Sequence, residues 1–215
     1  VNERYGSSDF LVVTYSPYKD LLAESTLNSL RELSAELLTL DRVESIDSIL
    51  NVPLLESPPK PIKELIKNVP TLESPGIDKA LAKKEFLNSP IYSDNLVSPD
   101  FKTTALLINL HDDPLYRELL QQRNSLRKKE KEETLSVPEQ IELKKVLVDF
   151  KNHRDKIRLV EHNNISQVRA IADKYRGDAK IFLGGASMVA DDLITFISSD
   201  LQVFGSAVLV FLMLT

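Results

Sequence analysis

The sequence predicts an α+β fold in which two strand–helix–strand halves share one sheet, in the ferredoxin-like split βαβ arrangement. Two observations lead to this prediction. Four short segments are apolar and rich in β-branched residues, as strands are, and helical patterns separate the first from the second and the third from the fourth. The four segments are 9–16, 42–49, 103–110 and 179–183. With 215 residues, 42% of them hydrophobic, the chain is long enough to bury a core under such a sheet.

The first half is the best defined. Leucines at helical spacing (27, 30, 33, 37 and 40) follow the first strand and predict a helix over 25–40, with Ser25 as its N-cap. The segment RVESIDSIL that follows alternates imperfectly and predicts the second strand. Because buried aliphatic side chains stabilise a sheet, we expect substitutions of the core positions Val12, Leu107 and Ile181 to be poorly tolerated.

A proline-rich excursion and a hairpin are predicted over residues 51–101. The near-repeats VPLLESPP and VPTLESPG bracket PIKELIKN, which predicts a short helix. We interpret the repeats as two similar turns, in preference to a lid over a ligand. A helix over 77–87 should follow, then a short strand and a turn at 98–100 that lead into the third strand.

A helical hairpin is predicted as an insertion over residues 112–160. Asp112-Asp113-Pro114 begins a charged helix, and Ser136 with Glu139 forms a capping box that begins a second helix. The second helix should reach about residue 175, with an interruption near 162–164. The hairpin carries 12 of the 27 basic residues and few large apolar ones. It should therefore be charged outside and thin in core, either free or docked on a neighbouring subunit or adaptor.

Charge and composition exclude several classes of protein. The net charge of −5 argues against a nucleic-acid partner, which would need a basic face. The run Arg127, Lys128, Lys129 and Lys131 is interleaved with glutamates, which is typical of a solvated helix face. The absence of cysteine excludes disulfides, zinc–thiolate sites and cysteine nucleophiles.

The sequence predicts no catalytic, cofactor-binding or metal-ligating residue, and we do not expect an enzyme. His153 and His162 are nine positions apart, a weak spacing for a metal site. Asp191 and Asp192 are adjacent in a helix and point about 100° apart, so they cannot easily share a proton. The segment GGAS at 184–187 lacks the lysine of a phosphate-binding loop, so it predicts a tight strand-to-helix turn.

The C-terminal segment predicts one nearly continuous helix from about residue 187. Its apolar positions recur at spacings of four and three, at Ala190, Ile194, Ile197, Leu201 and Phe204. The last charged residue is Asp200, and the side chains that follow are mostly apolar. A helix that spans a membrane needs roughly 20 apolar residues, and 201–215 provides fifteen.

Four ordered segments resemble the first extracytoplasmic loop of resistance-nodulation-division (RND) exporters, in the branch that includes the MMPL-type and hopanoid-exporter-like proteins. They are GSSDFLVVTYSP, VESIDSILNVPLLESP, SPIYSDNLVSPDFKTTALLINL and AKIFLGGASMVADDLITFISSDLQVFG, of which the last is the most specific. The resemblance implies that residues 1–200 form a periplasmic porter domain. It implies that 201–215 begin the second transmembrane helix, truncated inside the membrane span.

By this resemblance the chain handles substrate during proton-driven export at the inner membrane, on the periplasmic side, with no cofactor. The expected cargo is a lipid or another hydrophobic amphiphile. The expected partners are the second periplasmic loop and the transmembrane helices, and a homo-oligomer stays open. The family has no short substrate motif in this loop, so the residues along the substrate path are unknown. A periplasmic ligand-sensing domain of a receptor and a soluble enzyme with a C-terminal anchor are the alternatives.

Overall fold

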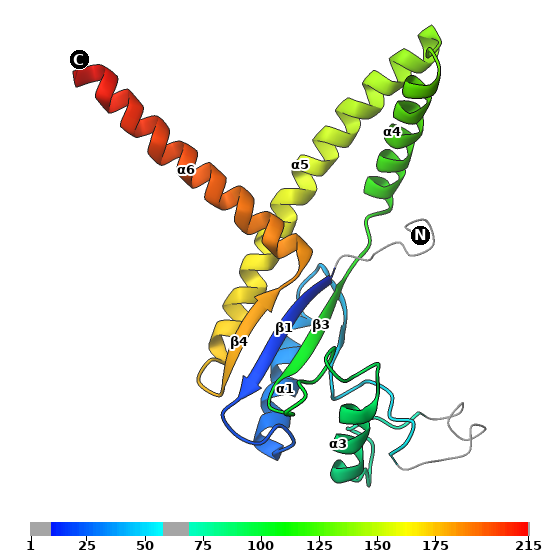
Figure 1. Ribbon diagram of the computed structural model, residues 1–215, viewed down its shortest axis with the longest axis vertical. Helices are drawn as coiled ribbons and strands as arrows, with labels where there is room; N and C mark the ends of the chain where they lie inside the picture. The colour runs from blue at the N-terminus through cyan, green and yellow to red at the C-terminus, as the bar shows by residue number, and fades with distance from the viewer. Residues whose placement is uncertain (1–9, 58–68, 215) are drawn as a thin grey trace. The chain divides into compact units, whose positions relative to one another are not determined.

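A computed structural model describes residues 10–57 and 69–214 and is centred on a four-stranded antiparallel sheet (Figure 1). The strands lie in the order β2-β3-β1-β4. Their bounds are β1 Phe10–Pro17, β2 Val43–Asp47, β3 Thr104–Leu110 and β4 Ala179–Gly184. The prediction that these four segments share one sheet is confirmed, and the protein is a mixed α+β protein.

Each pair of neighbouring strands is antiparallel. Strand β3 lies between β1 and β2 and pairs with both, while β1 lies between β3 and β4. Strands β1 and β2 therefore run in the same direction without touching, and so do β3 and β4. Helix α1, Glu24–Leu37, connects the first of these parallel pairs.

The core lies on one face of this sheet. In β1 and β3 it is formed by the residues next to those that we predicted. Leu11 and Val13 of β1 and Leu106 of β3 are fully buried, while Val12 and Leu107 face the opposite side, where they pair in register and are only half-buried. Ile181 is buried, as predicted. The error has a simple cause: β1 and β3 are apolar on both faces, so alternation cannot tell which face is covered.

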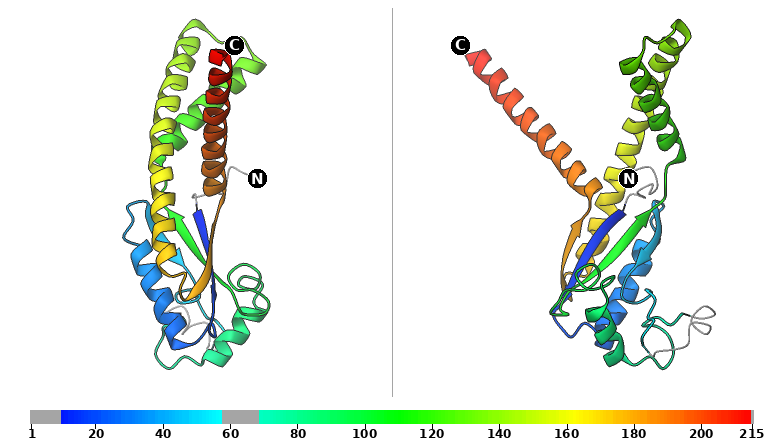
Figure 2. Two further views of the ribbon diagram at one scale, coloured as in Figure 1. Left: turned by 90° about the vertical axis from the view of Figure 1, so that its left-hand side faces the viewer. Right: turned by 45° about the vertical axis from the view of Figure 1, so that its right-hand side comes forward.

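Helix α1 covers the core face together with the last turns of α5 (Figure 2). Of the five predicted leucines, those at 27, 30, 33 and 37 are buried, while Leu40 lies beyond the end of the helix and is only half-buried. Ser25 is not the N-cap, since the helix begins after Ala23, which makes no side-chain cap. Asp20 organises the preceding turn instead, because its carboxylate accepts from Leu22 N and its carbonyl accepts from Thr26 Oγ1, each at 2.8 Å.

Strand β2 contains a bulge that explains its imperfect alternation. The pairing register with β3 shifts between Val43 and Ser45. The extra residue places Val43 and Ile46 on the same buried face, although strict alternation would separate them.

The excursion after β2 forms a small lobe with one described helix, α3, Lys79–Asn88, capped by the carboxylate of Asp78. The two near-repeats contact each other, since Leu54 N donates to the carbonyl of Pro70 at 2.8 Å. The predicted strand before β3 is reduced to isolated bridges of Val97, with Thr104 and with Ser93. The predicted turn at 98–100 is present, closed by Phe101 N and the carbonyl of Ser98 at 2.8 Å. PIKELIKN lies outside the described residues.

The chain divides into two compact units, residues 1–110 with 167–215, and residues 111–166. The second unit contains α4, Pro114–Glu132, and most of α5, Val137–Lys174. Helix α5 continues through 162–164, so the predicted interruption is wrong. Both Asn164 and Ile165 are buried there, and the packing of the apolar Ile165 overrides the weak helix propensity of asparagine.

Helices α4 and α5 form an antiparallel hairpin, as predicted. Asp113 caps α4 by accepting from Tyr116 N at 2.8 Å. Glu139 accepts from Ser136 N at 2.9 Å, which is one of the two bonds of the predicted capping box at the start of α5, and the Ser136 hydroxyl donates to the same carboxylate at 2.6 Å. Near the start of α4, the rings of Tyr116 and Phe150 lie 5.4 Å apart.

The last element is α6, Ala186–Leu214, which follows β4 after a single residue. It is one continuous helix, as the sequence predicted. Residues 207–214 are helical and not a strand of the core.

Candidate functional surface

The sheet face opposite the core carries an apolar strip across three strands. Phe182 of β4 and Phe10 of β1 are 64% and 46% exposed. Phe182 pairs with Thr14, and the half-buried Val12 pairs with Leu107 of β3. We refer to the apolar side chains at 10, 12, 107 and 182 as the open face of the sheet.

The turn at Gly184-Gly185 places the start of α6 beside this face. Gly185 has a φ of +130°, and a Cβ there would lie 2.9 Å from the carbonyl oxygen of Phe10. Any other residue would therefore collide with the backbone of β1 as well as adopt an unfavourable conformation. The predicted tight strand-to-helix turn is present, and glycine is required for close approach of the backbone.

Helix α6 continues the apolar surface with large side chains that are 53–74% exposed: Val189, Leu193, Phe196, Ile197, Leu201, Val203 and Phe204. Its polar side is anchored to the domain, because Asp192 accepts from Arg169 of α5 at 2.7 and 2.8 Å. This ion pair was not predicted, because nothing local relates residues on two separate helices. Asp192 thus has a structural partner on α5.

His153, one of the two histidines considered as metal ligands, lies in the helical hairpin. Within residues 10–57 and 69–214, no group of three or more His, Asp or Glu side chains could hold a metal ion. His153 lies 2.9 Å from a carboxylate oxygen of Asp113, the N-cap of α4. This pair joins the start of α4 to the middle of α5, so the role of His153 is structural.

A hollow of about 730 Å³ at the tip of the hairpin is also a poor ligand site. It is lined mainly by charged and polar residues, among them Glu130, Lys131, Glu133 and Lys144. Pockets for small molecules are usually apolar with a few polar groups, the reverse of this lining.

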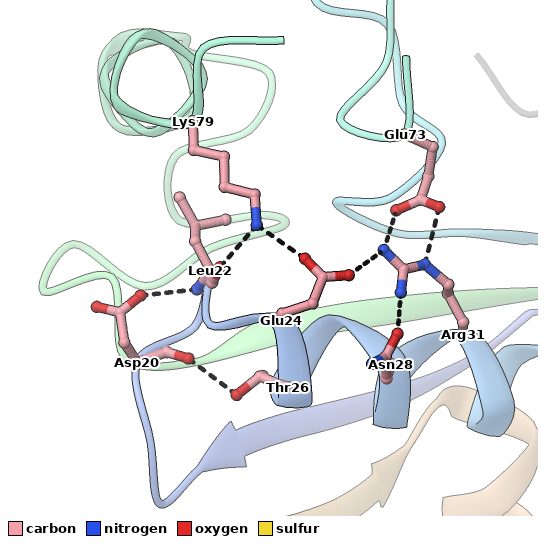
Figure 3. Close-up of polar contacts among 8 residues, drawn as sticks. All are labelled: Asp20, Leu22, Glu24, Thr26, Asn28, Arg31, Glu73 and Lys79. Atoms are coloured by element: carbon pink, nitrogen blue, oxygen red, sulfur yellow. Dashed lines mark hydrogen bonds and ion pairs between the residues drawn. The ribbon is translucent and has the colours of Figure 1, made fainter. Parts of the chain in front are cut away.

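A set of ion pairs, which we call the clasp, ties the excursion to α1 (Figure 3). Arg31 of α1 donates to both carboxylate oxygens of Glu73, at 2.8 and 3.1 Å, and to Glu24 at 3.1 Å. Lys79 of α3 donates to the other oxygen of Glu24 at 3.1 Å. The bonds from Lys79 and then Arg31 lower the pKa of Glu24, so the clasp is charged at neutral pH.

The excursion has a second anchor in Glu85, which is 7% exposed. Its two carboxylate oxygens accept from the backbone amides of Leu55 and Glu56, at 2.6 and 3.0 Å. Phe86 packs beside it, with its ring 5.6 Å from that of Tyr92. The first near-repeat is therefore fixed by a buried carboxylate, which favours the interpretation as ordered turns over that as a lid.

Comparisons with protein-family models, with curated proteins and with solved structures found no match to this chain. Among the residues that the structure describes, no helix combines the length and the apolar character needed to cross a membrane. The candidate surface is therefore described from its residues alone: it is an apolar sheet face that continues into an apolar helix.

Proposed function

We propose that this chain is a periplasmic porter domain of a proton-driven RND exporter of the MMPL and hopanoid-exporter-like branch, which handles lipids or other hydrophobic amphiphiles at the inner membrane. Its contribution is binding and gating, in which cargo has different affinities for different states of the domain. The observation that carries the proposal is the apolar surface formed by the open face and α6.

The exposure of α6 supports a hydrophobic environment around it. Seven of its large apolar side chains between Val189 and Phe204 are at least half exposed within the chain, whereas Ile194 is half-buried. Soluble monomers rarely leave so many contiguous apolar groups in water, and such surfaces mark contacts with proteins, ligands or lipid. A helix of this kind suits a partner made of transmembrane helices and bilayer.

The strand order is compatible with the finer fold that we propose, a ferredoxin-like porter subdomain. In that fold two βαβ units interlock, so that an antiparallel strand separates the two parallel strands of each unit. The order β2-β3-β1-β4 meets this requirement, and α1 provides the first crossover. The hairpin of α4 and α5 would be the insertion in the second crossover.

The proposed partners follow from the same surface. The open face and α6 would contact cargo, the second periplasmic loop and the transmembrane helices of the exporter. The net charge of −5 makes nucleic acid a poor partner.

The first test is the reading frame that contains this chain. An exporter of the proposed class should encode about a dozen spans in two repeats, each with a loop of this fold. A single loop between two spans, followed by a cytoplasmic signalling domain, would replace the proposal with the ligand-sensing alternative.

The second test is binding of a fluorescent lipid analogue to the full chain. Phe182→Gln should weaken binding several-fold, because the open face loses its most exposed aromatic ring. The matched control is Ile91→Gln, which removes an apolar side chain of similar exposure, 68%, from the excursion. Equal effects of the two substitutions would refute a role of the open face in cargo binding.

A further inference from the structure

The outer face of α5 carries a regular surface that the proposed export function does not use. Within the second unit, α5 packs on α4 through buried Leu143, Val146 and Phe150. On the opposite side, Ile141 is 64% exposed, Val148 is 57% exposed and Leu159 is 71% exposed. Large apolar groups thus point away from the hairpin core.

These groups belong to a heptad pattern. The exposed residues recur at alternating spacings of four and three: Ile141, Lys145, Val148, Asn152, Asp155 and Leu159. This is the spacing with which one helix packs along another in a coiled coil. We call these six residues the outer stripe of α5.

The outer stripe is complementary to itself when it is read in the opposite direction. Ile141 and Leu159 lie nine residues on either side of Phe150, and Lys145 and Asp155 lie five residues on either side. The remaining two, Val148 and Asn152, are also symmetric about Phe150, so that Val148 of one copy meets the polar Asn152 of the other near the axis. Two antiparallel copies would therefore match apolar with apolar at the ends and cation with anion between.

We propose that a second copy of this chain packs along the outer stripe, antiparallel, about a two-fold axis at the level of Phe150. Such an axis makes the contact isologous, so each favourable pair occurs twice. Ile141 contacts Leu159 of the other copy, and Lys145 pairs with Asp155. A parallel pair would instead place Asp155 against Asp155 and Lys145 against Lys145, which is repulsive.

The charges beside the stripe set the strength of the contact. On one flank Glu142 approaches Lys156 of the other copy, which is attractive, while Asp149 faces its own counterpart, which is repulsive. On the other flank Lys144 faces Arg158 of the other copy and Lys151 faces its own counterpart, which is repulsive. Asp155 also accepts from its neighbour Arg154 at 3.0 Å, yet its side chain stays 48% exposed and accessible. The dimer is consequently weak and forms at high local concentration.

Cross-linking tests the orientation directly, because the chain has no cysteine. Ile141→Cys and Leu159→Cys are prepared separately in the full chain, in a non-ionic detergent that covers α6, and mixed with a short bismaleimide. Cross-linked dimer should form in the mixture and not in either variant alone, since like positions are about 27 Å apart along the antiparallel helices. The control mixture replaces Leu159→Cys with Ser125→Cys, an exposed position on α4.

Cross-linking of either variant alone would show a parallel contact and overturn the proposal. So would a mixture that reacts no better than the Ser125→Cys control.

Charge reversal tests the chemistry of the contact. Lys145→Glu should weaken dimerisation about tenfold by sedimentation equilibrium in the same detergent, because two attractive pairs become repulsive. Asp155→Lys should do the same, and the double variant should restore the original association. Failure of the double variant to recover, while both single variants keep their helical content, would refute the pairing of Lys145 with Asp155.

Discussion

The sheet unit and the helical hairpin are stabilised in different ways. In the sheet unit, Leu11, Leu30 and Leu106 have no exposed surface and belong to a core shared by the strands and α1. In the hairpin, the buried side chains form one thin row that includes Leu119, Leu143 and Phe150, each still 5–9% exposed. Capping groups at the ends of α4 and α5, such as Asp113 and Glu139, also stabilise the hairpin.

The two units therefore owe their stability to different kinds of interaction. Full burial of one leucine contributes about 1.5–3 kcal/mol, so the sheet unit gains most from apolar burial. A capping interaction contributes about 1 kcal/mol, and an exposed ion pair contributes less. The hairpin should therefore respond more to pH and less to any single apolar truncation.

The largest effect is expected in the core of the sheet. Leu106→Ala should lower the free energy of unfolding by about 2–5 kcal/mol, because it leaves a cavity in a fully buried site. Its neighbour Leu107 is the matched control: it lies on the open face, and Leu107→Ala should cost about 1 kcal/mol. Urea denaturation measures both, and equal losses would mean that the open face is covered as completely as the core.

An intermediate effect is expected when acid weakens the capping box of the hairpin. The bond from Lys129, followed by those from Ser136, lowers the pKa of Glu139 from 4.5 to about 2. A carboxyl whose pKa falls on folding stabilises the fold above its unfolded pKa, and that contribution is lost as pH falls toward the folded pKa. Helical content should therefore decrease between about pH 4.5 and pH 2.

Far-ultraviolet circular dichroism of the parent and of Glu139→Gln measures this loss. The difference between the two proteins should be largest near neutral pH and should vanish toward pH 2. Glu142→Gln, on the same helix, is the control. A difference for Glu139→Gln that stays constant with pH would show that the ion pair with Lys129 contributes nothing.

The smallest effect is expected when the hairpin is removed. Replacing residues 112–160 with a short loop should leave the sheet unit folded, with its unfolding free energy changed by about 1 kcal/mol or less, since long and short loops differ little in closure entropy. Urea unfolding followed by circular dichroism of the remaining strands and α1 tests this. Global unfolding of the deletion variant would show that the two units are not energetically separate.

The sequence alone determined the features that depend on near neighbours. Asp113 before a proline, and Ser136 three residues before Glu139, predicted where α4 and α5 begin. The leucines of α1 predicted its buried side. The low number of charged residues near the C-terminus predicted the apolar character of α6. Caps and helical periodicity involve residues within about four positions of one another, so a single segment contains the information.

The tertiary structure decided what depends on distant segments. Leu11 and not Val12 belongs to the core, because the helix that packs on an apolar strand determines which of its two faces is buried. The tertiary structure carried α5 through Asn164, where packing outweighs propensity. It also brought Glu73 to Arg31 and Glu85 to the backbone of Leu55, contacts across 42 and 30 residues. The open face was missed for the same reason: which side of a sheet stays uncovered is a property of the whole chain, because only the packing of all its elements leaves one face without a cover.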